Sequence, residues 1–546
     1  MTREASRSFV IRRGCRIIIN RSFPMNSRAT RPRVVVVVLR TFVATMMIMM
    51  MMTTTTTTTT RRSSAHAYRF ALVGGLSFGY DLALVGGILH AMRDALGMSA
   101  GARGAVVGAV KVGAIVGAFV GAGSMRSAGR RWAAVTTTAA CSLVGGGTTW
   151  AFARWTSVGG IAFGRMVLGV GIGALAVIAP AYCGECSEAS VRGAVGASYE
   201  LSVCAGMVLA NAMTWWKPEK TYGLLLLSPG VVGFWSSMAF AMTRESPRWL
   251  VRRGMEDEAR AALREAGADE QAVEEEIGEI MAEERAMGAG GEDDVSFVRA
   301  FRDAVVDGAR EAFDGDEKRA VRLALALAVF NQMCASTSVI NYSSSVLRNV
   351  ARATSGTTDE SMDVYNLYTS LLIVCKTGGV VASISMVDRV GRRPLLFIGS
   401  IASGLSLGVV CFGYAVYSVG LTLLGMCAFM LAFASSFASI YWIVVSEIFS
   451  MRAKRSAIAF VTAALFASGA LSDLIFPSLL ASMGAVTFAF YACVCFAAAA
   501  FVHAYVPETA RKPLADVQAM LKRGLPPTVE YRPMDDDERH VELAEL

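Results

Sequence analysis

The sequence predicts an all-α membrane protein with twelve transmembrane helices arranged in two pseudo-symmetric six-helix halves. Three observations support this prediction. Of the 546 residues, 54% are hydrophobic and only 18% are charged, whereas a soluble protein has nearer a quarter charged residues. Apolar runs of about 20 residues, each long enough to cross a bilayer as a helix, recur from residue 68 onward. The motifs between these runs repeat at a nearly fixed spacing in the two halves of the chain.

The chain before the first apolar run is unlike a folded domain. Residues 1–65 form a low-complexity extension rich in Arg, Ser and Thr, with eight consecutive threonines at 53–60. Arg- and Ser-rich segments that are poor in acids are typical of organelle transit peptides. Low complexity is equally typical of a disordered or spurious extension, so both interpretations stay open.

Twelve apolar runs are predicted to span the membrane, six on either side of a polar insert. The N-terminal half, residues 66–243, has its spans at 69–90, 104–123, 132–152, 158–180, 194–214 and 222–243. The C-terminal half, residues 320–506, has its spans at 320–347, 363–386, 394–416, 419–445, 456–480 and 483–505.

The polar insert, residues 244–319, carries 22 acids and 12 bases, which excludes it from the membrane and predicts a cytosolic linker with short amphipathic helices. Elsewhere the bases cluster in alternate short loops rather than on one face. The positive-inside rule therefore explains them better than a nucleic-acid surface does. It places these loops and both termini in the cytosol, including the tail at 507–546.

An internal repeat relates the two halves. The recurring motifs are Gly129-Arg130-Arg131 with Gly391-Arg392-Arg393, Glu185 with Glu447, and Glu245 with Glu508, at offsets of 262, 262 and 263. Three motifs that keep one spacing across half the chain imply two homologous halves. In membrane transporters built from two repeats, the halves rock about a central site.

We expect the acids and bases of these motifs to form cytosolic salt bridges between and within the halves. Such bridges would close the inner side in one state and break in the other. The predicted gating residues are Arg130, Arg131, Glu185, Arg192, Glu245, Arg248, Asp388, Arg392, Arg393, Glu447, Arg452 and Glu508.

One carboxylate interrupts the first apolar run. Asp81 is the only charged residue between Phe70 and Leu89. A charged side chain at the bilayer centre costs about 2.5–3.5 kcal/mol on insertion scales. Asp81 is therefore either paired and structural, or it carries a proton or a ligand.

Residues 66–520 resemble the sugar porter family of the major facilitator superfamily. The matching motifs are Phe78-Gly79-Tyr80-Asp81, Gly164-Arg165, Pro180-x-Tyr182-x-x-Glu185, Glu245-Ser246-Pro247-Arg248-Trp249-Leu250, Val387-Asp388-Arg389-x-Gly391-Arg392-Arg393-Pro394, Ser446-Glu447-Ile448-Phe449 and Val506-Pro507-Glu508-Thr509. The resemblance implies the major facilitator fold and a transporter, not an enzyme, that works by alternating access without a cofactor.

The resemblance also implies a role for Asp81, because proton-coupled members of the family have aspartate at this position, with the arginine of the fourth span as its partner. That arginine is Arg165, and both residues lie roughly 9–12 Å below the outer ends of their spans. We expect the pair to couple transport to protons. A permanent ion pair that only fixes helix packing stays open, as does Lys111 as a rival partner at the same depth.

At the sugar-contacting positions of the family this chain is mixed. Gln332 matches a hydroxyl-binding amide and Trp442 matches a platform beneath a sugar ring, whereas other amides are replaced, and the asparagine of the eleventh span is Gly469. The predicted substrate-binding residues are Glu200, Asn331, Gln332, Thr337, Asn341, Lys376 and Trp442.

Glu200 and Lys376 leave two interpretations open. They would match a zwitterionic or carboxylate substrate near the midplane, or they would neutralise each other. The family position of these two residues favours substrate binding. The balance of mid-span charges favours mutual neutralisation to the same extent, because buried charges that balance are often paired. The mid-span acids Asp81, Glu200 and Asp473 balance the bases Lys111, Arg165 and Lys376.

The sequence thus predicts proton-coupled symport of a sugar or polyol. A carrier of a charged or zwitterionic solute, or a non-transporting nutrient sensor, are the alternatives. We expect a monomer in the lipid bilayer. We also expect no bound metal, because Cys183 and Cys186 form a lone CxxC pair without a second pair of ligands. We also expect no partnership with nucleic acid. The plasma membrane is the expected location, and an organelle envelope such as that of the plastid follows if the extension is a transit peptide.

Overall fold

A computed structural model of the chain describes residues 64–187, 192–215, 218–265, 270–286, 296–313, 317–355, 362–449, 451–510, 512 and 514–523. All regular elements within these ranges are helices, which confirms the all-α prediction. The N-terminal extension lies outside the described residues except for its last two positions. The C-terminal tail is described only in part.

Six long helices build the N-terminal half: α5 (Ala65–Leu96), α6 (Ala100–Ala128), α7 (Arg130–Arg154), α8 (Val158–Glu185), α9 (Arg192–Met213) and α10 (Pro218–Ala241). Serine side chains start two of them. Ser99 accepts a hydrogen bond from the backbone N–H of Ala102 at the start of α6, and Ser157 does the same for Gly160 at the start of α8. Such caps satisfy N–H groups that have no partner inside the helix.

Nine elements build the C-terminal half: α15 (Lys318–Met333), α16 (Ser336–Ser355), α17 (Met362–Val390), α18 (Arg392–Ala415), α19 (Val419–Phe433), the π-helix η1 (Ala434–Ala438), α20 (Ser439–Ile448), α21 (Met451–Met483) and α22 (Val486–Tyr505). They correspond to six spans. The predicted span 320–347 breaks after α15, where Ala335 has a φ of 63°. The predicted span 419–445 is one rod interrupted by η1.

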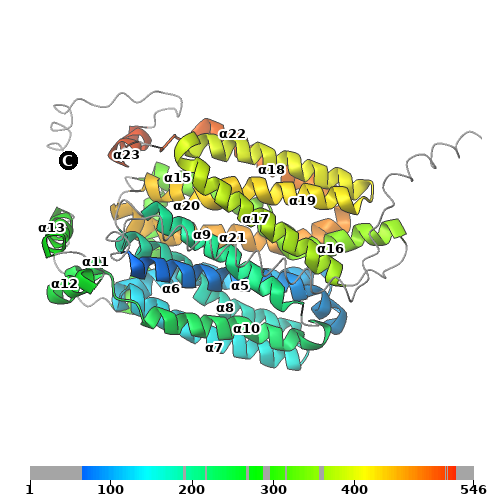
Figure 1. The fold of residues 1–546 in the computed structure, drawn as a ribbon, viewed down its shortest axis with the longest axis horizontal. Coiled ribbons are helices and arrows are strands. Elements are labelled where there is room, and N and C mark those ends of the chain that lie inside the picture. Colours follow the sequence, from blue (N-terminus) through cyan, green and yellow to red (C-terminus); the bar gives the residue numbers. More distant parts are fainter. Residues whose placement is uncertain are drawn as a thin grey trace, which may run out of the picture.

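Ten helical segments of the described chain are long and apolar enough to cross a membrane. Helices α7 and α9 are not among them, although each is more than 20 residues long. Five threonines lower the hydropathy of α7, and α9 carries Glu200. Both lie alongside the other long helices in Figure 1 and complete the six of the N-terminal half.

The two halves lie side by side, with α7 and α10 on the outer face of one and α18 and α22 on the outer face of the other (Figure 1). Contacts between the halves run along α6 with α21, α9 with α17, and α5 with α16. The residues of these six helices therefore decide what the halves present to each other.

Short helices follow the N-terminal half: α11 (Pro247–Arg252), α12 (Glu256–Glu265), α13 (Glu270–Ala286) and α14 (Phe297–Phe313), with α23 (Leu514–Arg523) after the last span. Helices α11 to α13 gather beyond one end of the long helices (Figure 1). Helix α14 buries the small residues Ala300, Ala304 and Gly308 and contacts both α6 and α21. It therefore touches both halves at once.

Candidate functional site

An acid–base cluster joins the start of α7 and the end of α8 to the segment 245–246 that follows α10 in the N-terminal half. Arg130 Nη2 donates to Glu185 Oε1 at 2.8 Å, and Ser246 Oγ donates to Glu185 Oε2 at 2.6 Å. The backbone N–H groups of Arg130 and Arg131 donate to the carboxylate of Glu245 at 2.8 and 3.0 Å. Each carboxylate therefore has several donors, which fixes its position.

The C-terminal half repeats this cluster group for group. Arg392 Nη2 donates to Glu447 Oε1 at 3.0 Å, and Thr509 Oγ1 donates to Glu447 Oε2 at 2.5 Å. The N–H groups of Arg392 and Arg393 donate to the carboxylate of Glu508 at 3.0 and 3.1 Å. The repeat seen in the sequence thus holds at the level of single hydrogen bonds.

A glycine with positive φ precedes each arginine pair. Gly129 has a φ of 88° and Gly391 a φ of 100°. A Cβ at Gly129 would lie 2.5 Å from Glu245 Oε2, and one at Gly391 would lie 2.7 Å from Glu508 Oε2. Only glycine leaves room for the carboxylate at these positions. Burial raises the pKa of the Glu245 carboxyl above its ordinary value, while the backbone hydrogen bonds that it accepts act in the opposite direction.

Each cluster joins residues within its own half. The expected salt bridges of these motifs between the halves therefore stay a prediction. Arg248 lies in α11. The side chains of Arg192, Asp388 and Arg452 lie outside the described residues.

Asp81 and Arg165 are brought together in the middle of the N-terminal half. Arg165 Nη1 lies 3.7 Å from Asp81 Oδ1, and neither side chain is more than 4% exposed. Arg165 Nε donates to the carbonyl of Val106 in α6 at 3.0 Å. Neither carboxylate oxygen of Asp81 accepts a hydrogen bond from any residue that the structure describes. The pair is thus a close ionic contact without a hydrogen bond.

A small cavity adjoins this carboxylate. Its polar lining comes from Ser77, Asp81, Thr138 and Ser142, on helices α5 and α7. The hydroxyl of Thr138 is buried and has no hydrogen-bond partner in the described part of the chain. The cavity has room for about one water molecule, and such a water would satisfy these groups.

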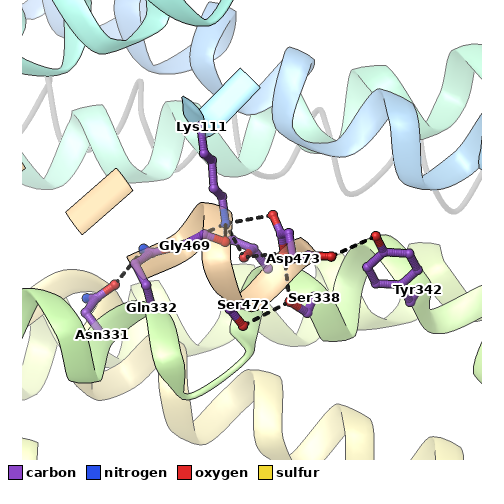
Figure 2. Close-up of polar contacts among 9 residues, drawn as sticks. Lys111, Asn331, Gln332, Ser338, Tyr342, Gly469, Ser472 and Asp473 are labelled. Carbon is purple, nitrogen blue, oxygen red and sulfur yellow. Dashed lines mark hydrogen bonds and ion pairs between the residues drawn. The ribbon is translucent and has the colours of Figure 1, made fainter. Parts of the chain in front are cut away.

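Lys111 of α6 reaches across to the other half (Figure 2). Its Nζ lies 2.8 Å from Asp473 Oδ2 of α21, and both side chains are nearly fully buried. The same ammonium donates to Thr337 Oγ1 at 2.6 Å, and to Gln332 Oε1 and the carbonyl of Gly469 at 3.3 Å each. Lys111 is therefore the partner of Asp473, and the predicted rivalry with Arg165 for Asp81 is wrong.

The break between α15 and α16 supplies most of the remaining groups. Gln332 lies before the break, and its Nε2 donates to Asn331 Oδ1 at 2.9 Å. Ser338 lies just after it and donates to Asp473 Oδ1 at 2.7 Å, while the hydroxyl of Tyr342 donates to the carbonyl of Asp473 at 3.1 Å. The two pieces therefore contact different members of the ion pair: Gln332 of α15 contacts the ammonium of Lys111, and Ser338 of α16 contacts the carboxylate of Asp473 (Figure 2).

Glu200 of α9 and Lys376 of α17 form a second contact between the halves. Lys376 Nζ lies 3.5 Å from Glu200 Oε1, with side-chain exposures of 11% and 15%. The structure therefore pairs them with each other. All six mid-span charges fall into three acid–base pairs, one within the N-terminal half and two between the halves.

The other two predicted binding residues lie apart from the Lys111 contacts. Asn341 is buried in α16, and no described residue makes a hydrogen bond to its Oδ1. Trp442 lies in α20 and packs edge-on against Tyr441, with ring centroids 5.0 Å apart. Lys111, Asp473 and Ser338 were absent from the predicted binding set. The balance of mid-span charges was the signal that could have found the first two.

Comparisons with known proteins agree with the motifs. A family model described as "Sugar (and other) transporter" matches residues 67–521. The chain is 25% identical over 479 residues to a D-xylose transporter of Levilactobacillus brevis, with 84% of this chain and 96% of the relative covered. It is 27% identical over 470 residues to plastidic glucose transporter 4 of Arabidopsis thaliana, with 83% and 80% covered.

Among solved structures, the fold is similar to that of the proton:xylose symporter XylE bound to 6-bromo-6-deoxy-D-glucose. The TM-score is 0.67 at 22% identity, with 84% of this chain and 99% of the other covered. The predicted major facilitator fold is confirmed by this likeness.

Proposed function

This chain belongs to the sugar transporter family of the major facilitator superfamily, and on that premise we propose that it carries a sugar or polyol together with protons by alternating access. The observation that carries the coupling is the Asp81–Arg165 pair. The pair is buried in the N-terminal half, no hydrogen bond joins its two members, and its carboxylate adjoins a small cavity with room for water. A carboxylate held in this way exchanges a proton without breaking other contacts.

Protonation of Asp81 would act through the helices that hold the pair. Arg165 is tied to α6 by its bond to Val106, whereas Asp81 sits on α5. Apolar surroundings favour the neutral carboxyl, and a nearby guanidinium favours the ionised one. Arg165 itself lies on α8, so loss of the charge on Asp81 removes an attraction between α5 and α8. Because α5 also contacts α16 of the other half, this change biases the position of one half against the other.

The two acid–base clusters, which we place on the cytosolic side, make each half rigid. Each joins helix ends within one half by a buried or half-buried ion pair, at 2.8 Å in the first half and 3.0 Å in the second. Motion between the halves is then a rigid-body rotation about the central contacts. The substrate passes between the halves when those contacts open.

The 3.5 Å contact between Glu200 and Lys376 supports a neutral solute over the alternative of a charged one, because the two side chains balance each other's charge. We also propose that both termini lie in the cytosol and that the protein resides in the plasma membrane. One relative is named as plastidic. Tags at both ends, in cells expressing the full chain, test the location: loss of the N-terminal tag together with envelope staining by the C-terminal tag would favour an organelle.

The test of the function is uptake into proteoliposomes. We expect radiolabelled D-xylose or D-glucose to accumulate above its outside concentration when the outside is made acidic, and a protonophore to abolish the accumulation. Equilibration without accumulation would contradict proton coupling. Binding without any transport would support the nutrient sensor instead.

A further inference from the structure

Lys111 occupies space that a side chain at position 469 would need. Gly469 lies on α21 with its carbonyl 3.3 Å from Lys111 Nζ. A Cβ added at this glycine would lie 2.5 Å from Gln332 Oε1 and 2.9 Å from Lys111 Nζ. The ammonium therefore stands where a residue with a side chain would place its first atoms, directly against the amide of Gln332.

The ammonium also has more acceptors than donors. A lysine has three N–H donors, and four oxygens lie within 3.3 Å of Lys111 Nζ. Two contacts are short, at 2.8 Å to Asp473 and 2.6 Å to Thr337. The two to Gln332 and Gly469 are long, at 3.3 Å. The long contacts can give way to a better acceptor without leaving the ammonium unsatisfied.

We propose that Lys111 and Asp473, with Gln332, form a recognition site for adjacent hydroxyl groups of a neutral polyhydroxylated solute. This proposal rests on the proposed transport of a sugar or polyol and names two residues that determine its specificity. Lys111 is held against Gly469 and Gln332, in space that a side chain at position 469 would fill. It is the only group from the N-terminal half among these contacts, so its engagement depends on the closure of α6 against α21.

The chemistry of the cluster suits a diol. One hydroxyl accepts from the ammonium of Lys111 and donates to the carboxylate of Asp473, and its neighbour donates to Gln332 Oε1, which is released from the lysine. The remaining amide N–H of Gln332 stays bonded to Asn331. Hydrogen bonds to charged partners are stronger than those between neutral groups.

The balance of charge sets the preference between solutes. Lys111 and Asp473 sum to zero and are almost fully buried. A carboxylate solute would add an unbalanced charge to this buried site, which is unfavourable. We therefore expect D-glucose to bind more tightly than D-glucuronate, which differs from it by one carboxylate.

The test removes the space for the ammonium without changing any charge. Gly469→Ala places a methyl group against Lys111 and Gln332, whereas the matched control Gly408→Ala lies in α18 with nothing within 4 Å of the new methyl. For D-xylose and D-glucose exchange at equal pH, we expect KM to rise roughly tenfold to hundredfold in Gly469→Ala, with wild-type KM in Gly408→Ala. Wild-type KM in both variants would overturn the proposal, as would tighter binding of D-glucuronate than of D-glucose.

A second variant tests the proposal even if Gly469→Ala does not fold. The double substitution Lys111→Asp with Asp473→Lys keeps an ion pair between α6 and α21 but moves the ammonium to α21. We expect wild-type thermal stability with a raised KM for sugar. A wild-type KM would show that the pair is only structural and would overturn the proposal. Exchange at equal pH does not need proton coupling, so a failure of coupling appears separately, as sugar that equilibrates but is not concentrated.

Discussion

Two buried ion pairs in this protein differ in how their charges are held. Lys111 and Asp473 lie 2.8 Å apart, and hydroxyls of Thr337 and Ser338 complete the contacts. Asp81 and Arg165 lie 3.7 Å apart, and the carboxylate has no hydrogen bond from the described residues. The first pair is thus held in place by several neighbouring hydroxyls, whereas the Asp81 carboxylate has no donor and lies beside a water-sized cavity, as the proposed proton exchange requires.

The two acid–base clusters, around Glu185 and Glu447, provide a second contrast. They occur in both halves with the same hydrogen bonds, whereas the mid-span charges have no counterpart at the repeat offset. Shifted by 262, Asp81, Arg165, Lys111 and Asp473 correspond to Ser343, Cys427, Ile373 and Asn211. Features common to both halves maintain the shared architecture. We propose that the charges present in one half only serve transport itself.

The largest effect is expected from breaking the Lys111–Asp473 pair. Lys111→Met leaves the carboxylate of Asp473 buried without its counter-charge, which should lower the free energy of unfolding by about 3–5 kcal/mol. Thermal and denaturant unfolding of the purified protein in detergent measures this. The matched control is Lys111→Met with Asp473→Leu, which removes both charges and should recover most of the loss. A single variant as stable as the double would contradict the assignment of the pair.

The two acid–base clusters should respond alike to loss of their arginines. Arg130→Ala and Arg392→Ala each remove a charged hydrogen bond to a half-buried glutamate, at 2.8 and 3.0 Å. Each should cost about 1.5–3 kcal/mol, because the geometries match. Parallel unfolding measurements compare the two, and a twofold difference between the losses would show that the halves are not equivalent at this end.

A smaller effect is expected beside Asp81. Thr138→Val keeps the shape of the side chain but removes the buried hydroxyl that faces the cavity. We expect proton-driven uptake to slow a few-fold, with sugar exchange at equal pH unchanged. Thr136→Val on the exposed side of the same helix is the control. If both rates fell together, the cavity would have no separate part in coupling.

Much of this architecture was predictable from the sequence, because apolar runs report membrane spans and repeated motifs report the two halves. Arg165 as the partner of Asp81 followed from the family resemblance, and the depth of the two residues along their helices agreed with it. Depth did not identify the partner of Lys111, because that depends on helix rotation and on packing between the halves. Nor did composition reveal the break at Ala335, since the flanking pieces read as one continuous apolar run.

The most direct test of the account is accumulation by Asp81→Asn. The substitution keeps the size of the side chain but removes the charge and the exchangeable proton. Reconstituted wild-type protein should concentrate D-xylose or D-glucose under an inward proton gradient. Asp81→Asn should exchange the same sugar across the membrane at equal pH yet fail to concentrate it. A variant that concentrates sugar to the wild-type level would contradict the role of Asp81 in proton coupling.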